Sequence, residues 1–147
     1  MSEAAQQFFR RAEELLSKGD NLGALHNFEK SLSLDSSCAL CKSYVALLMA
    51  SERGQLQKAI EIAEEALGNM PDNCTLYLNL GKLYLRAGRK TDALEVVRRG
   101  LSRGEFPEGL RFLEEMGNRR KPVFPFLPRN NFFNKYAGLI LKRLGGK

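Results

Sequence analysis

A unit that recurs about every 34 residues is the feature that most restricts how this 147-residue chain can fold. Three glycines mark the unit, at Gly19, Gly54 and Gly88, and an alanine follows each glycine by five residues. A leucine follows each alanine by eight residues, so the aligned positions are Ala24, Ala59, Ala93, Leu32, Leu67 and Leu101. A unit of this length buries its apolar face by stacking on its neighbours. The repeat therefore predicts a short array of stacked units.

Within each unit, apolar residues recur with the spacing of two helices. In the first unit, an apolar stripe at helical spacing runs from Ala5 to Leu16, is interrupted at Gly19 and resumes at Ala24. Glycine suits the left-handed residue that follows a helix. Residues 5–70 contain no proline and no strand-like alternation. The chain is therefore predicted to be all-α, with helix–turn–helix units at about residues 5–38, 39–73 and 74–106 and a capping helix at residues 107–117.

The third unit resembles the tetratricopeptide repeat family closely. Its residues Tyr77-x-x-Leu80-Gly81-x-x-Tyr84, followed by Ala93-x-x-x-Val97, are similar to the family pattern W-x-x-L-G-x-x-Y…A-x-x-x-F. The first two units follow this pattern more loosely, and the resemblance covers about residues 5–103. It implies a helix–turn–helix solenoid of three repeats, whose first helices line a concave groove that binds a peptide or a helix.

The helical phase of the first helices indicates which side chains would line that groove. The predicted groove residues are Phe9, Arg10, Glu13, Leu16, Ser43, Tyr44, Leu47, Leu78, Asn79, Lys82, Leu85 and Arg86. Chaperone-binding members of the family hold the terminal carboxylate of a peptide with lysine, asparagine and arginine side chains. Here only Asn79 stands where such a clamp requires it. Because the set is mixed and rather apolar, we expect an apolar helix or an extended peptide as the ligand.

Positive charge is concentrated in the second part of the chain. Residues 1–85 contain 8 basic and 11 acidic side chains, residues 86–147 contain 15 and 6, and from residue 117 onward there are eight basic residues and no acid. This charge distribution indicates a solvated basic tail or, as an alternative function, a basic C-terminal half that binds an acidic partner, an anionic membrane surface or a nucleic acid. The basic residues that would form such a binding surface, which we call the basic patch, are Arg98, Arg99, Arg103, Arg119, Arg120, Lys121 and Arg129, with Lys142 and Arg143.

The residues that usually serve catalysis and metal binding are scarce. Cys38 and Cys41 form a C-x-x-C pair, but a zinc site needs four ligands, and Cys74 and the single histidine, His26, are the only further soft candidates. We therefore expect structural cysteines, no metal, no cofactor and no enzymatic activity. The low cysteine count, the lack of a signal-peptide pattern and the absence of an apolar run of about 18 residues favour a cytoplasmic protein.

Residues 118–147 are predicted to combine an extended segment with an amphipathic helix. Three prolines in residues 121–129 prevent a helix, yet this segment carries Val123, Phe124, Phe126 and Leu127, which need an apolar contact. Residues 131–144 have the apolar stripe of a helix. The extension resembles those of bacterial tetratricopeptide-repeat proteins. It either caps the array, fills the groove or forms a homodimer through residues 122–144, and the cap is favoured because added helices usually cover the end of a solenoid.

Truncation after Gly117 distinguishes these alternatives. If the extension caps the array, the truncated chain should unfold at a lower temperature and aggregate, because apolar surface becomes exposed. Circular dichroism during heating and light scattering measure the two effects. A soluble monomer of unchanged stability would show that the extension is a dispensable tail. A stable product that binds peptides more tightly would show that the extension fills the groove.

Overall fold

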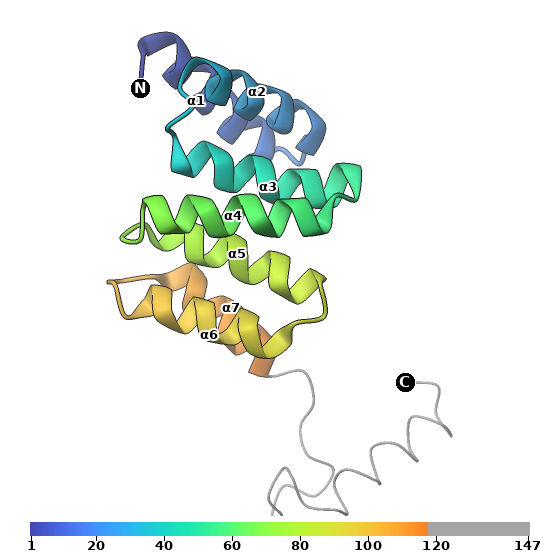
Figure 1. The fold of residues 1–147 in the computed structure, drawn as a ribbon, viewed down its shortest axis with the longest axis vertical. Helices are drawn as coiled ribbons and strands as arrows, with labels where there is room; N and C mark the ends of the chain where they lie inside the picture. Colours follow the sequence, from blue (N-terminus) through green and yellow to red (C-terminus); the bar gives the residue numbers. More distant parts are fainter. Residues whose placement is uncertain (118–147) are drawn as a thin grey trace, which may run out of the picture. The chain divides into compact units, whose positions relative to one another are not determined.

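The computed structural model describes residues 1–117, which form seven α-helices and no strand (Figure 1). In chain order the helices are α1 (Glu3–Ser17), α2 (Asn21–Leu34), α3 (Ala39–Arg53), α4 (Leu56–Asn69), α5 (Cys74–Arg86), α6 (Lys90–Leu101) and α7 (Pro107–Gly117). α1 packs against α2, α3 against α4 and α5 against α6, and neighbouring pairs stack on one another in chain order. The predicted all-α array of helix–turn–helix units is confirmed.

The chain divides into two compact units, residues 1–111 and residues 112–147. Of the second unit, the structure describes the last residues of α7, up to Gly117. The predicted extended segment and C-terminal helix lie outside the described residues. None of the seven helices described is long and apolar enough to cross a membrane.

The repeated glycines follow the first helix of each pair. Gly19, Gly54 and Gly88 have φ angles of 82°, 66° and 76°, in the left-handed region that residues with a Cβ rarely adopt. After Gly19 the amide of Asp20 donates a hydrogen bond to the carbonyl of Leu15 (2.9 Å), and the equivalent bond recurs after Gly88. Such a bond satisfies a carbonyl that the helix end leaves free. The glycine repeat in the sequence therefore has a cause in the backbone of the turns.

Small residues allow the two helices of each pair to approach closely. The repeated alanines, Ala24, Ala59 and Ala93, are fully buried. Gly81 on α5 faces α6 so closely that a Cβ atom at this position would lie 2.5 Å from Cγ2 of Val97. Any larger residue at position 81 would therefore have to displace Val97 or push α6 away from α5.

Gly81→Leu should lower the free energy of unfolding by about 1–3 kcal/mol or more, because the close contact with α6 leaves no room for the side chain. Chemical denaturation followed by circular dichroism measures the change. Gly68→Leu on α4 is the matched control, since no atom lies within 4 Å of its Cβ position. Replacing a helical glycine where there is space should preserve or raise stability. A Gly81 variant as stable as the parent chain would contradict the assigned contact.

Candidate functional site

The first helices of the three pairs line a cavity of about 510 Å³, which we call the groove. Its volume lies within the range of about 300–1,000 Å³ that is typical of ligand pockets. Helices α1, α3 and α5 and the connection into α7 supply the lining residues, which are Leu16, Tyr44, Leu47, Cys74, Thr75, Leu78, Asn79, Lys82, Glu105, Phe106 and Glu108.

The structure brings about half of the predicted groove residues together in this cavity. They are Leu16, Tyr44, Leu47, Leu78, Asn79 and Lys82. Arg10, Glu13 and Leu85 do not line the cavity, and neither does the half-buried Phe9. Arg86 is directed elsewhere, because its Nη1 donates to the carbonyl of Ala50 near the end of α3 (3.4 Å).

Helical phase missed the end of the groove formed by Glu105, Phe106 and Glu108. These residues belong to the connection between α6 and α7 and to the first turn of α7. The helical phase of α1, α3 and α5 cannot place residues of this connection, and it also did not identify Cys74 and Thr75 at the start of α5 as lining residues. The sequence could have indicated this end of the groove through Phe106, because an apolar residue directly before a helix often packs against that helix. Its side chain is buried.

The aromatic ring of Tyr44 is held firmly in the groove. It stacks on Phe28 with 4.7 Å between the ring centroids and an angle of 5° between the ring planes. Phe9 meets both rings edge-on, with centroid distances of 5.4 Å to Phe28 and 6.3 Å to Tyr44. Burial, together with the negative charges of Glu13 and Glu108, raises the pKa of the Tyr44 hydroxyl. The groove therefore presents a rigid, uncharged phenol at neutral pH.

A buried hydrogen bond engages Asn79. Its side chain is 2% exposed, and its Nδ2 donates to Oγ of the fully buried Ser43 at 3.0 Å. The bond joins α5 to α3 and satisfies two polar groups that the packing has removed from water. An asparagine that clamps a carboxylate must offer its amide to the ligand. Asn79, the only residue predicted at a position of the carboxylate clamp, thus joins two neighbouring repeats.

The charges in the groove lining are unfavourable for a terminal carboxylate. Among the described residues, Lys82 is the only cation in the lining, whereas Glu105 and Glu108 contribute two negative charges. The remaining walls are largely apolar, through Leu47 and Phe106 among others. An apolar ligand that carries a cationic group near α7 would meet the more favourable electrostatic environment.

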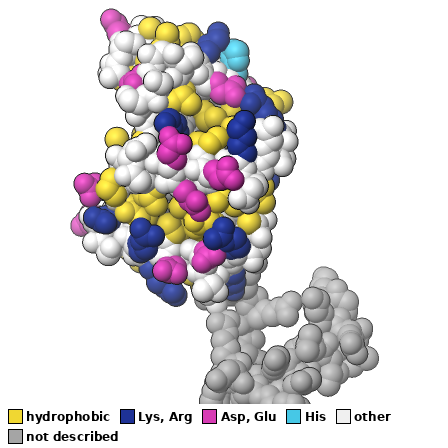
Figure 2. All heavy atoms as spheres, in the orientation of Figure 1, with side chains coloured by type: hydrophobic (Ala, Val, Ile, Leu, Met, Phe, Trp, Pro, Cys, Tyr) yellow, Lys and Arg dark blue, Asp and Glu magenta, His cyan; other side chains and the backbone are white. Residues whose placement is uncertain are grey.

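The predicted basic patch falls only partly within the described residues. Arg98, Arg99 and Arg103 are exposed on α6 and just after it, whereas Arg119, Arg120, Lys121 and Arg129 lie outside the described residues. Residues 118–147 hold eight of the 23 Lys and Arg and none of the 17 Asp and Glu, which leaves 15 basic and 17 acidic side chains, a net charge of −2, in residues 1–117. Figure 2 shows side chains of both signs interspersed with apolar ones on the visible face.

Cys38 and Cys41 both have structural roles. The Sγ atom of Cys38 accepts a hydrogen bond from the amide of Cys41 (3.2 Å) and thereby caps the start of α3. Cys41 is fully buried, with its Sγ 3.5 Å from Oγ of Ser31, and burial raises the pKa of its thiol to about 12. Within residues 1–117, no three His, Cys, Asp or Glu side chains come together as metal ligands, and His26 is exposed.

At about pH 8 the folded chain should expose no more than two of its three cysteines to a chromogenic disulfide reagent. The thiolate is the reactive form, and Cys41, with a pKa of about 12, has almost none at this pH, whereas Cys38 and Cys74 are partly exposed. Guanidinium should release the third thiol, and Cys41→Ser should abolish that late signal. Stoichiometric zinc in freshly purified protein, lost in Cys38→Ser with Cys41→Ser, would contradict the structural roles.

Comparison with known proteins places the fold. Residues 50–115 match the family model of the tetratricopeptide repeat (TPR). No curated protein matches the sequence. The TPR domain of Arabidopsis OM64 has a TM-score of 0.65 at 16% identity, over 80% of this chain and 96% of that one.

Two further solved structures have the same fold. The first TPR of Spaghetti (RPAP3), bound to the HSP90 peptide SRMEEVD, has a TM-score of 0.66 at 14% identity, over 80% of this chain and 95% of that one. The Sgt2 TPR domain from Aspergillus fumigatus has a TM-score of 0.62 at 17% identity, over 91% of this chain and 95% of that one. At these identities the likeness concerns the fold, and it confirms the TPR solenoid that the sequence predicted.

Proposed function

Because this chain is built of tetratricopeptide repeats, we propose that it is a non-catalytic adaptor that binds a peptide or a helix of a partner protein in the groove. The observation that carries this proposal is a cavity of about 510 Å³ whose walls include Tyr44, Leu47, Leu78 and Phe106. Apolar walls with a few polar groups suit the burial and orientation of peptide side chains. A solved domain of the same fold is bound to a peptide, which supports this class of ligand.

The charges of the groove favour an internal segment of the partner over its C-terminus. The peptide bound to the first TPR of RPAP3 has the sequence SRMEEVD, which is acidic near its end. In the present chain, Glu105 and Glu108 would repel such an end, and the Asn79 side chain is only 2% exposed. We therefore propose an apolar ligand segment with a basic side chain directed toward α7. The free thiols of the chain support a cytoplasmic location for the adaptor.

A second candidate function rests on the charge of residues 118–147. These residues carry eight positive and no negative side chains, whereas residues 1–117 have a net charge of −2. An extension of this charge, together with Arg98, Arg99 and Arg103, would attract an anionic membrane surface or a nucleic acid. Co-sedimentation with anionic vesicles and mobility shift of RNA, each at two salt concentrations, test it, since steep salt dependence is the signature of such binding.

Leu47→Glu should weaken peptide binding in the groove about 10- to 100-fold. The change removes an apolar contact of about 1.5–3 kcal/mol and adds a further negative charge beside Glu105 and Glu108. Suitable probes are peptides selected on the intact chain from a random library, and the SRMEEVD peptide is expected to bind weakly or not at all. Fluorescence polarisation measures the affinities.

Leu94→Glu is the matched control for this experiment. Leu94 is a half-buried leucine on α6 that does not line the groove, so its replacement should affect stability without affecting peptide affinity. Equal losses of affinity in the two variants would contradict the proposed site. Selected peptides that require a free C-terminal carboxylate would contradict the proposed ligand.

A further inference from the structure

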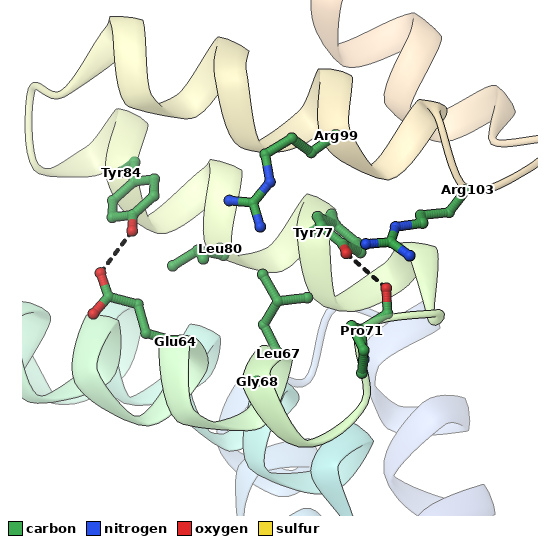
Figure 3. Close-up of a pocket in the computed structure, with 9 residues that line it drawn as sticks. All are labelled: Glu64, Leu67, Gly68, Pro71, Tyr77, Leu80, Tyr84, Arg99 and Arg103. Atoms are coloured by element: carbon green, nitrogen blue, oxygen red, sulfur yellow. Dashed lines mark hydrogen bonds between the residues drawn. The ribbon is translucent and has the colours of Figure 1, made fainter.

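A second cavity, of about 290 Å³, lies between α4, α5 and α6 and shares no lining residue with the groove (Figure 3). We call it the arginine cleft. Its apolar part consists of Leu67 on α4 and Tyr77 and Leu80 on α5. Arg99, on the last turn of α6, and Arg103, in the turn that follows, supply positive charge.

The apolar part of the cleft is preformed. Leu67, Tyr77 and Leu80 are 7%, 1% and 3% exposed. The hydroxyl of Tyr77 donates to the carbonyl of Pro71 at 2.6 Å. Its ring fits beneath α6 because Gly100 has no side chain, since a Cβ there would lie 2.7 Å from Cβ of Tyr77. The cleft therefore has an ordered apolar floor, of which only a small edge at Leu67 and Leu80 is open to a ligand.

The guanidinium groups of Arg99 and Arg103 extend toward the space between α4 and α5 (Figure 3). Among the described residues Arg99 has no ion-pair partner, and its guanidinium lies 5.9 Å from the ring centroid of Tyr77. Arg103 approaches Asp72 at 3.5 Å, but the Asp72 side chain is 88% exposed, so this pair is largely solvated. The cleft thus holds two cations whose charge its own residues compensate only weakly.

Glu64, the acidic residue of the cleft lining, is bonded to a tyrosine of the same lining. Oε1 of Glu64 accepts a hydrogen bond from the Tyr84 hydroxyl at 2.6 Å. Burial and this bond raise the pKa of Tyr84 to about 12, so the hydroxyl stays a donor across the physiological pH range. The guanidinium of Arg89 lies over the same ring, 4.3 Å from its centroid. Glu64 therefore belongs to a contact between α4 and α5 at the end of the cleft away from Arg103 (Figure 3).

We propose that the arginine cleft binds an acidic side chain of a partner peptide between Arg99 and Arg103, with apolar atoms of the peptide at the exposed edge of Leu67 and Leu80. Guanidinium groups bind carboxylates through paired, charge-assisted hydrogen bonds. A volume of about 290 Å³ is small for a ligand site and suits one or two side chains. Because the two cavities share no residue, the site does not depend on the groove, and one chain can hold two peptide segments at once.

A nucleic acid or an anionic membrane fits the cleft less well than an acidic peptide does. Polyanions gain affinity from many cations along a surface, whereas here two arginines flank a recess. The cations that a polyanion would need are concentrated instead in residues 118–147, which carry eight of the 23 Lys and Arg.

The test titrates the isotope-labelled full chain with the capped peptide acetyl-Gly-Leu-Glu-Leu-Gly-amide and follows amide chemical shifts by nuclear magnetic resonance. We expect shifts at cleft residues of α4, α5 and α6, and at least tenfold weaker binding when glutamine replaces glutamate in the peptide. Arg99→Gln with Arg103→Gln should reduce affinity at least tenfold. Arg98→Gln with Arg111→Gln changes the net charge equally at exposed residues outside both cavities and should leave affinity unchanged.

Gly68→Leu provides a steric test with the arginines intact. Gly68 lines the cleft and has open space at its Cβ position, so a leucine there should fill the apolar part and abolish binding while the chain stays folded. Gly68→Ala should retain binding. Equal binding of the glutamine peptide, or equal losses in the two double-arginine variants, would overturn the proposal. Phosphatidylserine vesicles or an RNA oligonucleotide that shift the same amides at lower concentration than the peptide would overturn it as well.

Discussion

The close approach of paired helices at residues without bulky side chains is the contact on which the rest of this structure depends. Between α5 and α6, Gly81 lies so near Val97 that a Cβ would overlap with it. In each of the three pairs the repeated alanine is fully buried. Dense packing of this kind makes each pair a stiff element, because interiors at this density resist changes in volume. The stack can therefore present preformed cavities.

One glycine takes part in shaping both cavities. A Cβ at Gly100 on α6 would lie 2.7 Å from Cβ of Tyr77 and 3.3 Å from Cε1 of Phe106. Tyr77 lines the arginine cleft and Phe106 lines the groove. The absence of a side chain at position 100 thus leaves room for both aromatic residues beside this part of α6. The groove and the cleft are separate in their lining residues but share this element of packing.

The two cavities differ in charge, so the ligands that we propose for them differ as well. The groove combines Lys82 with two glutamates, whereas the arginine cleft contains two arginines and one glutamate that is bonded to a tyrosine. Peptide segments of opposite charge would therefore prefer opposite sites. Such an arrangement suits an adaptor, because a partner segment that fits one cavity is repelled by the other.

The sequence alone determined the elements of the array and part of the groove. The left-handed turn needs glycine, and the close helix contact needs alanine or glycine. The fold can therefore be recognised in the sequence from Gly19, Gly54 and Gly88 and the alanines that follow them. Helical phase also predicted Tyr44 and Leu47, because both are set by positions within a single helix. These are local properties of the chain, and each repeat shows the glycine and the alanine at the same positions.

The contacts between one helix pair and the next became known only from the tertiary structure. Asn79 is a connector because Ser43, 36 residues earlier, lies 3.0 Å away. Phe106 reaches the groove through the connection between α6 and α7, which no helical phase describes. Arg99 of α6 and Arg103 of the turn after it share a cavity with leucines of α4 and α5 because neighbouring repeats pack at a particular distance. The packed surfaces of several helices jointly set that distance, and a residue pattern along one helix does not contain it.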